Sequence, residues 1–198
     1  MSTIVKSPDP EHPFEIDLRN PGLAALWAWL WPGAGHIYQR RYAKGVLFMV
    51  CILSTYFFGF GIGGWRVVYA SFKAPDLRLP YLCQVGIGIP ALPALIEWQR
   101  AYADEPKPAL FGGVFRPPGD TNHRISENDG NDALHDWHFQ LKGRFELGTL
   151  YTMIAGLLNI LAVFDAYSGP SFLPQENEKN KAPPDDDEDE NKKSTPDT

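Results

Sequence analysis

Residues 31–45 read Trp31-Pro32-Gly33-Ala34-Gly35-His36-Ile37-Tyr38-Gln39-Arg40-Arg41-Tyr42-Ala43-Lys44-Gly45. This segment lies between two apolar stretches that carry no charge, and its turn holds three basic residues, Arg40, Arg41 and Lys44. Glycine permits the tight turning and the close helix contact that a hairpin requires. The pattern therefore predicts a basic hairpin that joins two membrane helices.

Four stretches of the chain lack Asp, Glu, Lys and Arg over about the 20 residues that a bilayer requires. They are Asn20–Gln39, Gly45–Trp65, Leu79–Ile96 and Leu147–Phe164. Proline removes a helical hydrogen-bond donor, so Pro32 interrupts the first stretch, and Pro90 and Pro93 interrupt the third. We predict an all-α integral membrane protein with about four transmembrane helices and a disordered acidic C-terminal tail.

The polar residues divide the chain into segments. We expect a polar N-terminal segment at 1–21, a membrane region with three helices at 22–98, a polar loop at 99–146, a fourth transmembrane helix at 147–170 and a tail at 171–198. Within the loop, apolar residues between 131 and 146 are typical of an amphipathic helix on the membrane surface. The tail carries nine acids against four lysines, and it has too few apolar residues to fold.

Charge and cysteine usage exclude several classes of protein. The net charge of −6 comes mostly from the tail, which argues against nucleic acid as a partner. Cys51 and Cys83 both fall inside apolar stretches, where cysteine behaves as a small hydrophobe. The sequence has no nucleophile elbow, phosphate loop or Cys-x-x-Cys pair. It therefore predicts no catalytic residues, no cofactor and no enzymatic activity.

Polar side chains at membrane depth are costly and mark candidate functional residues. The candidates are His36, Glu97, Asn159 and Asp165. Glu97 and Asp165 fall at the ends of apolar stretches, where water is close. Asn159 lies deepest, and an interhelical hydrogen bond is its expected role. His36 can titrate near neutral pH, although an imidazole at an interface needs no special role.

A second histidine pair resembles a metal site. His135 and His138 are three residues apart and would share one face of a helix, so both could reach one cation. Zinc sites usually need three or four ligands, and no third ligand is evident in the sequence. We therefore predict no metal.

Basic residues also give an expected orientation. With four spans, the hairpin and the central loop share one side, with seven basic residues there against five on the other. Because positive charge favours the cytoplasmic side, both termini are expected outside and the hairpin and loop inside.

The pattern Gly33-x-Gly35-His36-x-Tyr38 with Lys44-Gly45 resembles the two-transmembrane (TM-two) domain family over residues 22–64. Residues 145–152, 155–159 and 165–167 resemble bacterial multi-pass proteins of unknown function that carry such a hairpin. The resemblance implies a protein of the bacterial inner membrane with no established activity. Its hairpin motif comprises Pro32, Gly33, Gly35, His36, Tyr38, Arg40, Arg41, Lys44 and Gly45.

The leading functional hypothesis is a non-enzymatic membrane scaffold or interaction protein. Its expected partners are the lipid bilayer and either a second copy of the chain or another membrane protein. The alternative is a small transporter or channel subunit, in which Pro90, Pro93 and Asn159 mark a broken-helix site. An intramembrane or metal-assisted enzyme is the third hypothesis.

Overall fold

The computed structural model describes residues 4–6, 15–17, 19–72, 77–103, 105, 107–118 and 133–169, with only the backbone given for the strands and for residues 133, 135 and 136. The described chain is helical, as predicted, apart from one antiparallel strand pair, β1 (Ile4–Lys6) and β2 (Glu15–Asp17). The helices are α1 (Pro21–Leu30), α2 (Ala34–Tyr38), α3 (Tyr42–Ile62), α4 (Pro80–Gln84), α5 (Pro93–Ala101), α6 (Ala133–Leu141) and α7 (Gly143–Ser168). Two 3₁₀ turns, η1 (Val85–Ile87) and η2 (Ile89–Ala91), connect α4 to α5.

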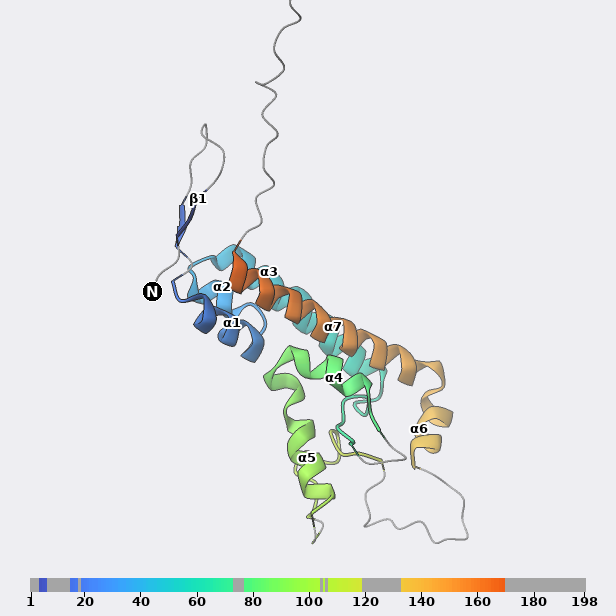
Figure 1. The fold of residues 1–198 in the computed structure, drawn as a ribbon. Helices are drawn as coiled ribbons and strands as arrows, with labels where there is room; N and C mark the ends of the chain where they lie inside the picture. The colour runs from blue at the N-terminus through green and yellow to red at the C-terminus, as the bar shows by residue number, and fades with distance from the viewer. Residues whose placement is uncertain are drawn as a thin grey trace, which may run out of the picture.

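Two long helices, α3 and α7, pack side by side and form the axis of the molecule (Figure 1). They run antiparallel, because Gly59 near the end of α3 packs on Gly148 near the start of α7. At the opposite end, Lys44 of α3 pairs with Asp165 of α7. Both helices are apolar and, with 21 and 26 residues, long enough to cross a membrane.

The two faces of this helix pair differ in composition. The face of α7 that is buried against the other helices carries small and polar residues at alternating spacings of four and three: Gly148, Thr152, Ala155, Asn159, Ala162 and Ala166. The outer surface carries large exposed apolar side chains, including Val46, Leu47, Val50, Phe57, Phe58, Leu150, Leu157, Leu161 and Phe164. Small residues allow close helix contact, and the outward apolar side chains suit a lipid environment.

The first predicted span is not one helix. Asn20 caps the start of α1 by accepting a hydrogen bond from the backbone N–H of Leu23 at 3.2 Å, and the helix ends at Leu30. The chain then turns at Gly33, whose φ of +80° favours glycine. It returns as α2, so that Arg19 donates to the carbonyl oxygen of Tyr38 at 3.0 Å. The predicted 20-residue span is therefore a short helical hairpin with both ends on one side.

The third predicted span is also divided. α4 ends after five residues, and the chain passes through η1, through Gly88 with φ +80°, and through η2 before α5 begins at Pro93. Phe72 contacts Tyr81 of α4 and Trp98 of α5, so the two helices return toward the same end. The prolines at 90 and 93 remove backbone donors where a continuous helix would need them. Two helices of the described chain, rather than four, have spanning length.

The amphipathic helix predicted near 131–146 is divided at Lys142, whose φ is +51°. α6 ends before it and α7 begins after it, so residues 143–146 belong to the long helix. Trp137 of α6 contacts Tyr69 and Phe145, which fastens α6 across the start of α7. The predicted disordered tail at 171–198 lies outside the described residues.

The prediction that the hairpin and the central loop lie on the same side is wrong for this fold. The basic turn at 40–44 lies at the Asp165 end of the helix pair. The described parts of the central loop lie at the other end, where Phe115 stacks on Phe60 and Leu141 packs on Gly64. The prediction assumed four spans, whereas two helices of the described chain have spanning length.

Candidate functional site

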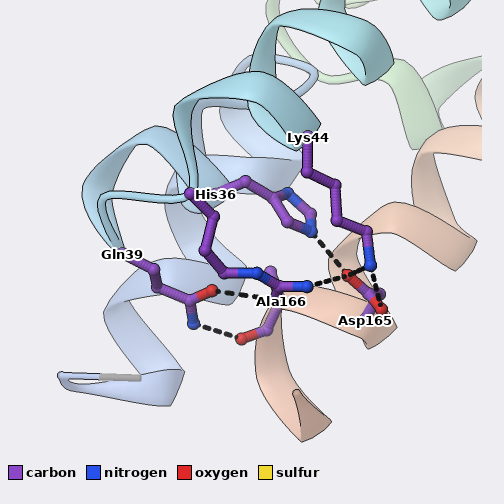
Figure 2. Close-up of polar contacts among 6 residues, drawn as sticks. His36, Gln39, Lys44, Asp165 and Ala166 are labelled. Carbon is purple, nitrogen blue, oxygen red and sulfur yellow. Dashed lines mark hydrogen bonds and ion pairs between the residues drawn. The ribbon is translucent and has the colours of Figure 1, made fainter. Parts of the chain in front are cut away.

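Two of the polar residues predicted at membrane depth, Asn159 and Asp165, lie on α7 and form the centres of two clusters. One is an ion-pair cluster around Asp165, close to the end of the helix (Figure 2). The other is a buried junction around Asn159, nearly two turns earlier. The sequence did not indicate which residues each would meet.

Asp165 contacts three side chains from the hairpin. Nε2 of His36 lies 2.7 Å from Oδ2, and Nζ of Lys44 lies 2.8 Å from each carboxylate oxygen. The guanidinium of Arg41 lies 3.6 Å from Oδ2. Beside them, Nε2 of Gln39 donates to the carbonyl oxygen of Ala166 at 2.6 Å. These contacts tie α2 and the start of α3 to the end of α7.

His36 is fully buried, and its ring contacts the Phe48 ring edge-on at 4.9 Å between centroids. Burial lowers the pKa of His36 below its ordinary value, and this effect outweighs the neighbouring Asp165 carboxylate, which raises it. Within the described residues, Nδ1 of the ring is buried without a hydrogen-bond partner. A second ring proton would therefore find no acceptor. The geometry fits a neutral imidazole whose Nε2–H donates to Asp165.

The other hairpin motif residues shape the turn. A Cβ atom on Gly45 would lie 2.9 Å from the carbonyl oxygen of Gly33, so these two backbones approach closely. Gly35 packs against Ala24 and Ala28 of α1. Arg40 is exposed at the surface, and Pro32 is buried in the turn between α1 and α2. Most of the motif therefore positions the backbone, and only His36, Arg41 and Lys44 reach Asp165.

The Asn159 junction joins two helix ends. Nδ2 of Asn159 donates to the carbonyl oxygens of Ala28 at 3.1 Å and of Gly86 at 2.9 Å, and it lies 3.5 Å from that of Trp29. The last carbonyls of a helix have no partner within the helix. One amide therefore caps the end of α1 and the end of η1 together. The interhelical hydrogen bond expected of Asn159 is present.

Sequence reasoning missed the polar contacts along the first half of α7. Gln84 of α4 donates to Thr152 at 2.8 Å, and Arg78 donates to Thr149 at 3.0 Å. Arg78 also lies over the ring of Tyr69 at 4.4 Å. The four-and-three spacing of small and polar residues on α7 was the available signal, because it marks one helix face.

Glu97 lies in a different place from its expected position near water. It is fully buried on α5, and its Oε1 accepts a hydrogen bond from the backbone N–H of Leu110 at 2.6 Å. Nη1 of Arg116 lies 3.7 Å from Oε2. The carboxylate therefore holds the loop after α5 against the helix.

The histidine pair gives no metal site within the described residues. Nδ1 of His138 lies 2.8 Å from Oε1 of Glu146, and the side chain of His135 lies outside the description. Across the described side chains, no three or more His, Cys, Asp or Glu residues gather in a way that could hold a metal ion.

Fold and site together define a class: a helical protein with two helices of membrane-spanning length, whose inward polar groups bind one another. Residues 23–179 match the family described as a family of unknown function (DUF6677), and the chain belongs to that family. No curated protein matches the chain, and no solved structure matches it. The likeness to the TM-two hairpin stays a prediction.

Proposed function

We propose that this chain is a multi-pass integral membrane protein that acts without catalysis, as a membrane scaffold or interaction protein. The observation that carries the proposal is the contrast between the two faces of the α3–α7 pair. Large apolar side chains face outward, while Thr152, Asn159 and Asp165 face inward and bind other protein groups. In lipid, polar groups must find partners inside the protein, and the amide nitrogen of Asn159 and the carboxylate of Asp165 do so.

The two divided segments fit the same proposal. α1 and α2 enter from the end that holds Asp165, whereas α4 and α5 enter from the end that holds Gly148 (Figure 1). They meet near Asn159, where their carbonyl groups are covered by protein. Irregular backbone at membrane depth is tolerated where protein buries it. The proposed topology therefore has two spans and two re-entrant hairpins, with residues 19 and 169 on one side.

A scaffold is favoured over an enzyme by how the candidate residues are engaged. Both oxygens of Asp165 bind cations, and Oε1 of Glu97 accepts a backbone hydrogen bond. Asn159 caps helix ends. Each of these side chains already connects two segments of the chain, which is a structural role.

Membrane embedding can be tested with the native thiols. Cys51 is exposed on the outer face of α3, so a bilayer would shield it from a water-soluble maleimide. In a Cys83→Ser background, we expect Cys51 to react only after detergent is added. An added Arg66→Cys substitution, just beyond α3, is the matched control and should react in intact or permeabilised membranes. Labelling of Cys51 in sealed and permeabilised membranes without detergent would contradict embedding.

The scaffold role needs a separate test. A photo-crosslinking residue in place of Leu161, which is 66% exposed, should give a discrete protein adduct in native membranes. The same residue in place of the buried neighbour Ala162 should give only crosslinks within the chain. Adducts with lipid alone at Leu161 and at other outward positions would count against a scaffold.

A second candidate function, a small transporter or channel subunit, is favoured by the Asn159 junction. Discontinuous helices that meet at mid-membrane are typical of transporter binding sites. Here the Oδ1 atom of Asn159 is buried without a partner among the described residues, while its Nδ2 atom contacts three carbonyl oxygens. Monovalent cation flux from proteoliposomes distinguishes the two. The scaffold proposal expects no flux above empty vesicles, whereas a transporter expects flux that Asn159→Leu abolishes.

A further inference from the structure

The turn between α2 and α3 gathers positively charged side chains at the Asp165 end of the helix pair. Arg40, Arg41 and Lys44 lie at this end, and we call them the basic turn cluster. Asp165 is the carboxylate that binds them among the described residues, and it serves Arg41 and Lys44. His36 adds no charge when neutral. Three cations against one carboxylate leave the described cluster a net positive charge of about two.

The start of α3 adds to this imbalance. No side chain caps its N-terminus, and its first turn contains no acidic residue. Lys44 stands there instead, although the positive pole of a helix favours an anion. The start of α7 differs, because Glu146 lies in its first turn. An anion at the basic turn cluster would balance both the side chains and the helix pole.

Exposed apolar and aromatic side chains lie directly beside the cluster. On the first turns of α3, Tyr42 is 60% exposed and Leu47 is 59% exposed. Near Asp165 on α7, Phe164 is 67% exposed. A free phosphate ion has no apolar part that could contact these side chains, whereas a phospholipid would place its acyl chains against them.

We propose that the basic turn cluster binds the phosphate headgroup of an anionic phospholipid. Arg40 is the main contact, because its exposed guanidinium can bind a phosphate through two parallel hydrogen bonds. Arg41 and Lys44 lie beside it, each paired with Asp165, and add attraction. This inference rests on the proposed membrane location, and it goes further by naming the lipid class and the residues that select it.

The test measures which lipids stay with the full chain. The protein is purified in detergent from vesicles that contain equal amounts of phosphatidylglycerol and phosphatidylcholine, and bound lipids are counted by native mass spectrometry. We expect the wild type to retain phosphatidylglycerol preferentially. Arg40→Gln should lower that preference about fivefold, which corresponds to one basic residue near an anionic surface. Arg144→Gln, an exposed arginine in the first turn of α7, is the matched control and should leave it unchanged.

A second variant tests the sign of the effect. Asp165→Asn removes the carboxylate that competes for Arg41 and Lys44, so it should raise phosphatidylglycerol retention. Equal retention of both lipids by the wild type, or equal losses in Arg40→Gln and Arg144→Gln, would overturn the proposal. Displacement of the lipid by inorganic phosphate would assign the site to a free anion and overturn it too. These outcomes are distinct from failed embedding, which the Cys51 labelling detects.

Discussion

His36 and Asp165 are 129 residues apart in the sequence, and their side chains meet at 2.7 Å between Nε2 and Oδ2. This contact joins the hairpin near the start of the chain to the last turns of α7. Lys44 and Arg41 bind the same carboxylate, so one acidic residue organises the whole end of the helix pair. The stability of this end should depend on that one charge.

Replacing Asp165 tests this dependence. Asp165→Asn should lower the free energy of unfolding by about 2 kcal/mol, because it leaves Lys44 and Arg41 without their carboxylate in a partly buried site. Asp165 is 25% exposed, which keeps the loss below that of a fully buried pair. Thermal unfolding of the purified protein in detergent measures the change. Glu146→Gln on the same helix is the control. Because Glu146 is 60% exposed, this substitution should change the free energy of unfolding by less than about 1 kcal/mol.

The buried His36 predicts a pH dependence of stability. Burial lowers the pKa of His36 from its ordinary value of 6.5, so below that pH the unfolded chain binds more protons than the folded chain. The stabilising effect is complete above pH 6.5 and is lost as the pH falls through the lowered pKa. The groups facing the ring are Asp165, Arg41, Lys44 and Phe48.

A single substitution isolates this effect from the other histidines. His36→Gln keeps a donor for Asp165 and removes the titration. Unfolding midpoints between about pH 5 and pH 8 should therefore fall less steeply toward acid in His36→Gln than in the wild type. The same dependence of the unfolding midpoint on pH in the two proteins would show that His36 does not cause the loss of stability at low pH.

The sequence predicted the helical class and both long helices, because a charge-free apolar run of spanning length rarely forms anything other than a long helix. It could not separate a single long helix from a short helical hairpin, since Asn20–Gln39 is equally apolar in either arrangement. The prolines and Gly33 marked the breaks but not the direction of the chain after them. That direction depends on contacts such as Arg19 with Tyr38, which form only in the folded molecule.

The candidate site was predicted residue by residue, but not as an arrangement. Asn159 and Asp165 stood out because polar groups are costly in an apolar helix. Their partners did not stand out, because Gly86 and Ala28 contribute only backbone oxygens, which every residue has. His36 looked like an ordinary interfacial imidazole until the fold buried it.

Asn159 should be essential for joining the end of α1 to η1. Leucine has a similar volume to asparagine, but Asn159→Leu leaves the carbonyl groups of Ala28 and Gly86 without a donor. The free energy of unfolding should therefore fall by about 2 kcal/mol. Leu158→Asn, which adds the same amide at an exposed neighbouring position, is the reciprocal control for expression and insertion. Limited proteolysis should cut the α1–α2 hairpin faster in Asn159→Leu. Unchanged stability and cleavage would show that the amide is not a required cap.

Close packing of α3 on α7 gives the last prediction, which compares two glycines near the same crossing. A Cβ atom on Gly148 would lie 2.6 Å from the carbonyl oxygen of Gly59 and 2.7 Å from the Cα atom of Gly63. Both neighbours are backbone atoms, so Gly148→Ala must push the helices apart and should cost about 1–3 kcal/mol. At Gly61, the added Cβ would meet only Trp65, at 3.9 Å. Gly61→Ala should therefore leave the unfolding midpoint unchanged or raise it slightly, since alanine favours the helix. Equal effects of the two substitutions would mean that the crossing does not depend on a glycine at 148.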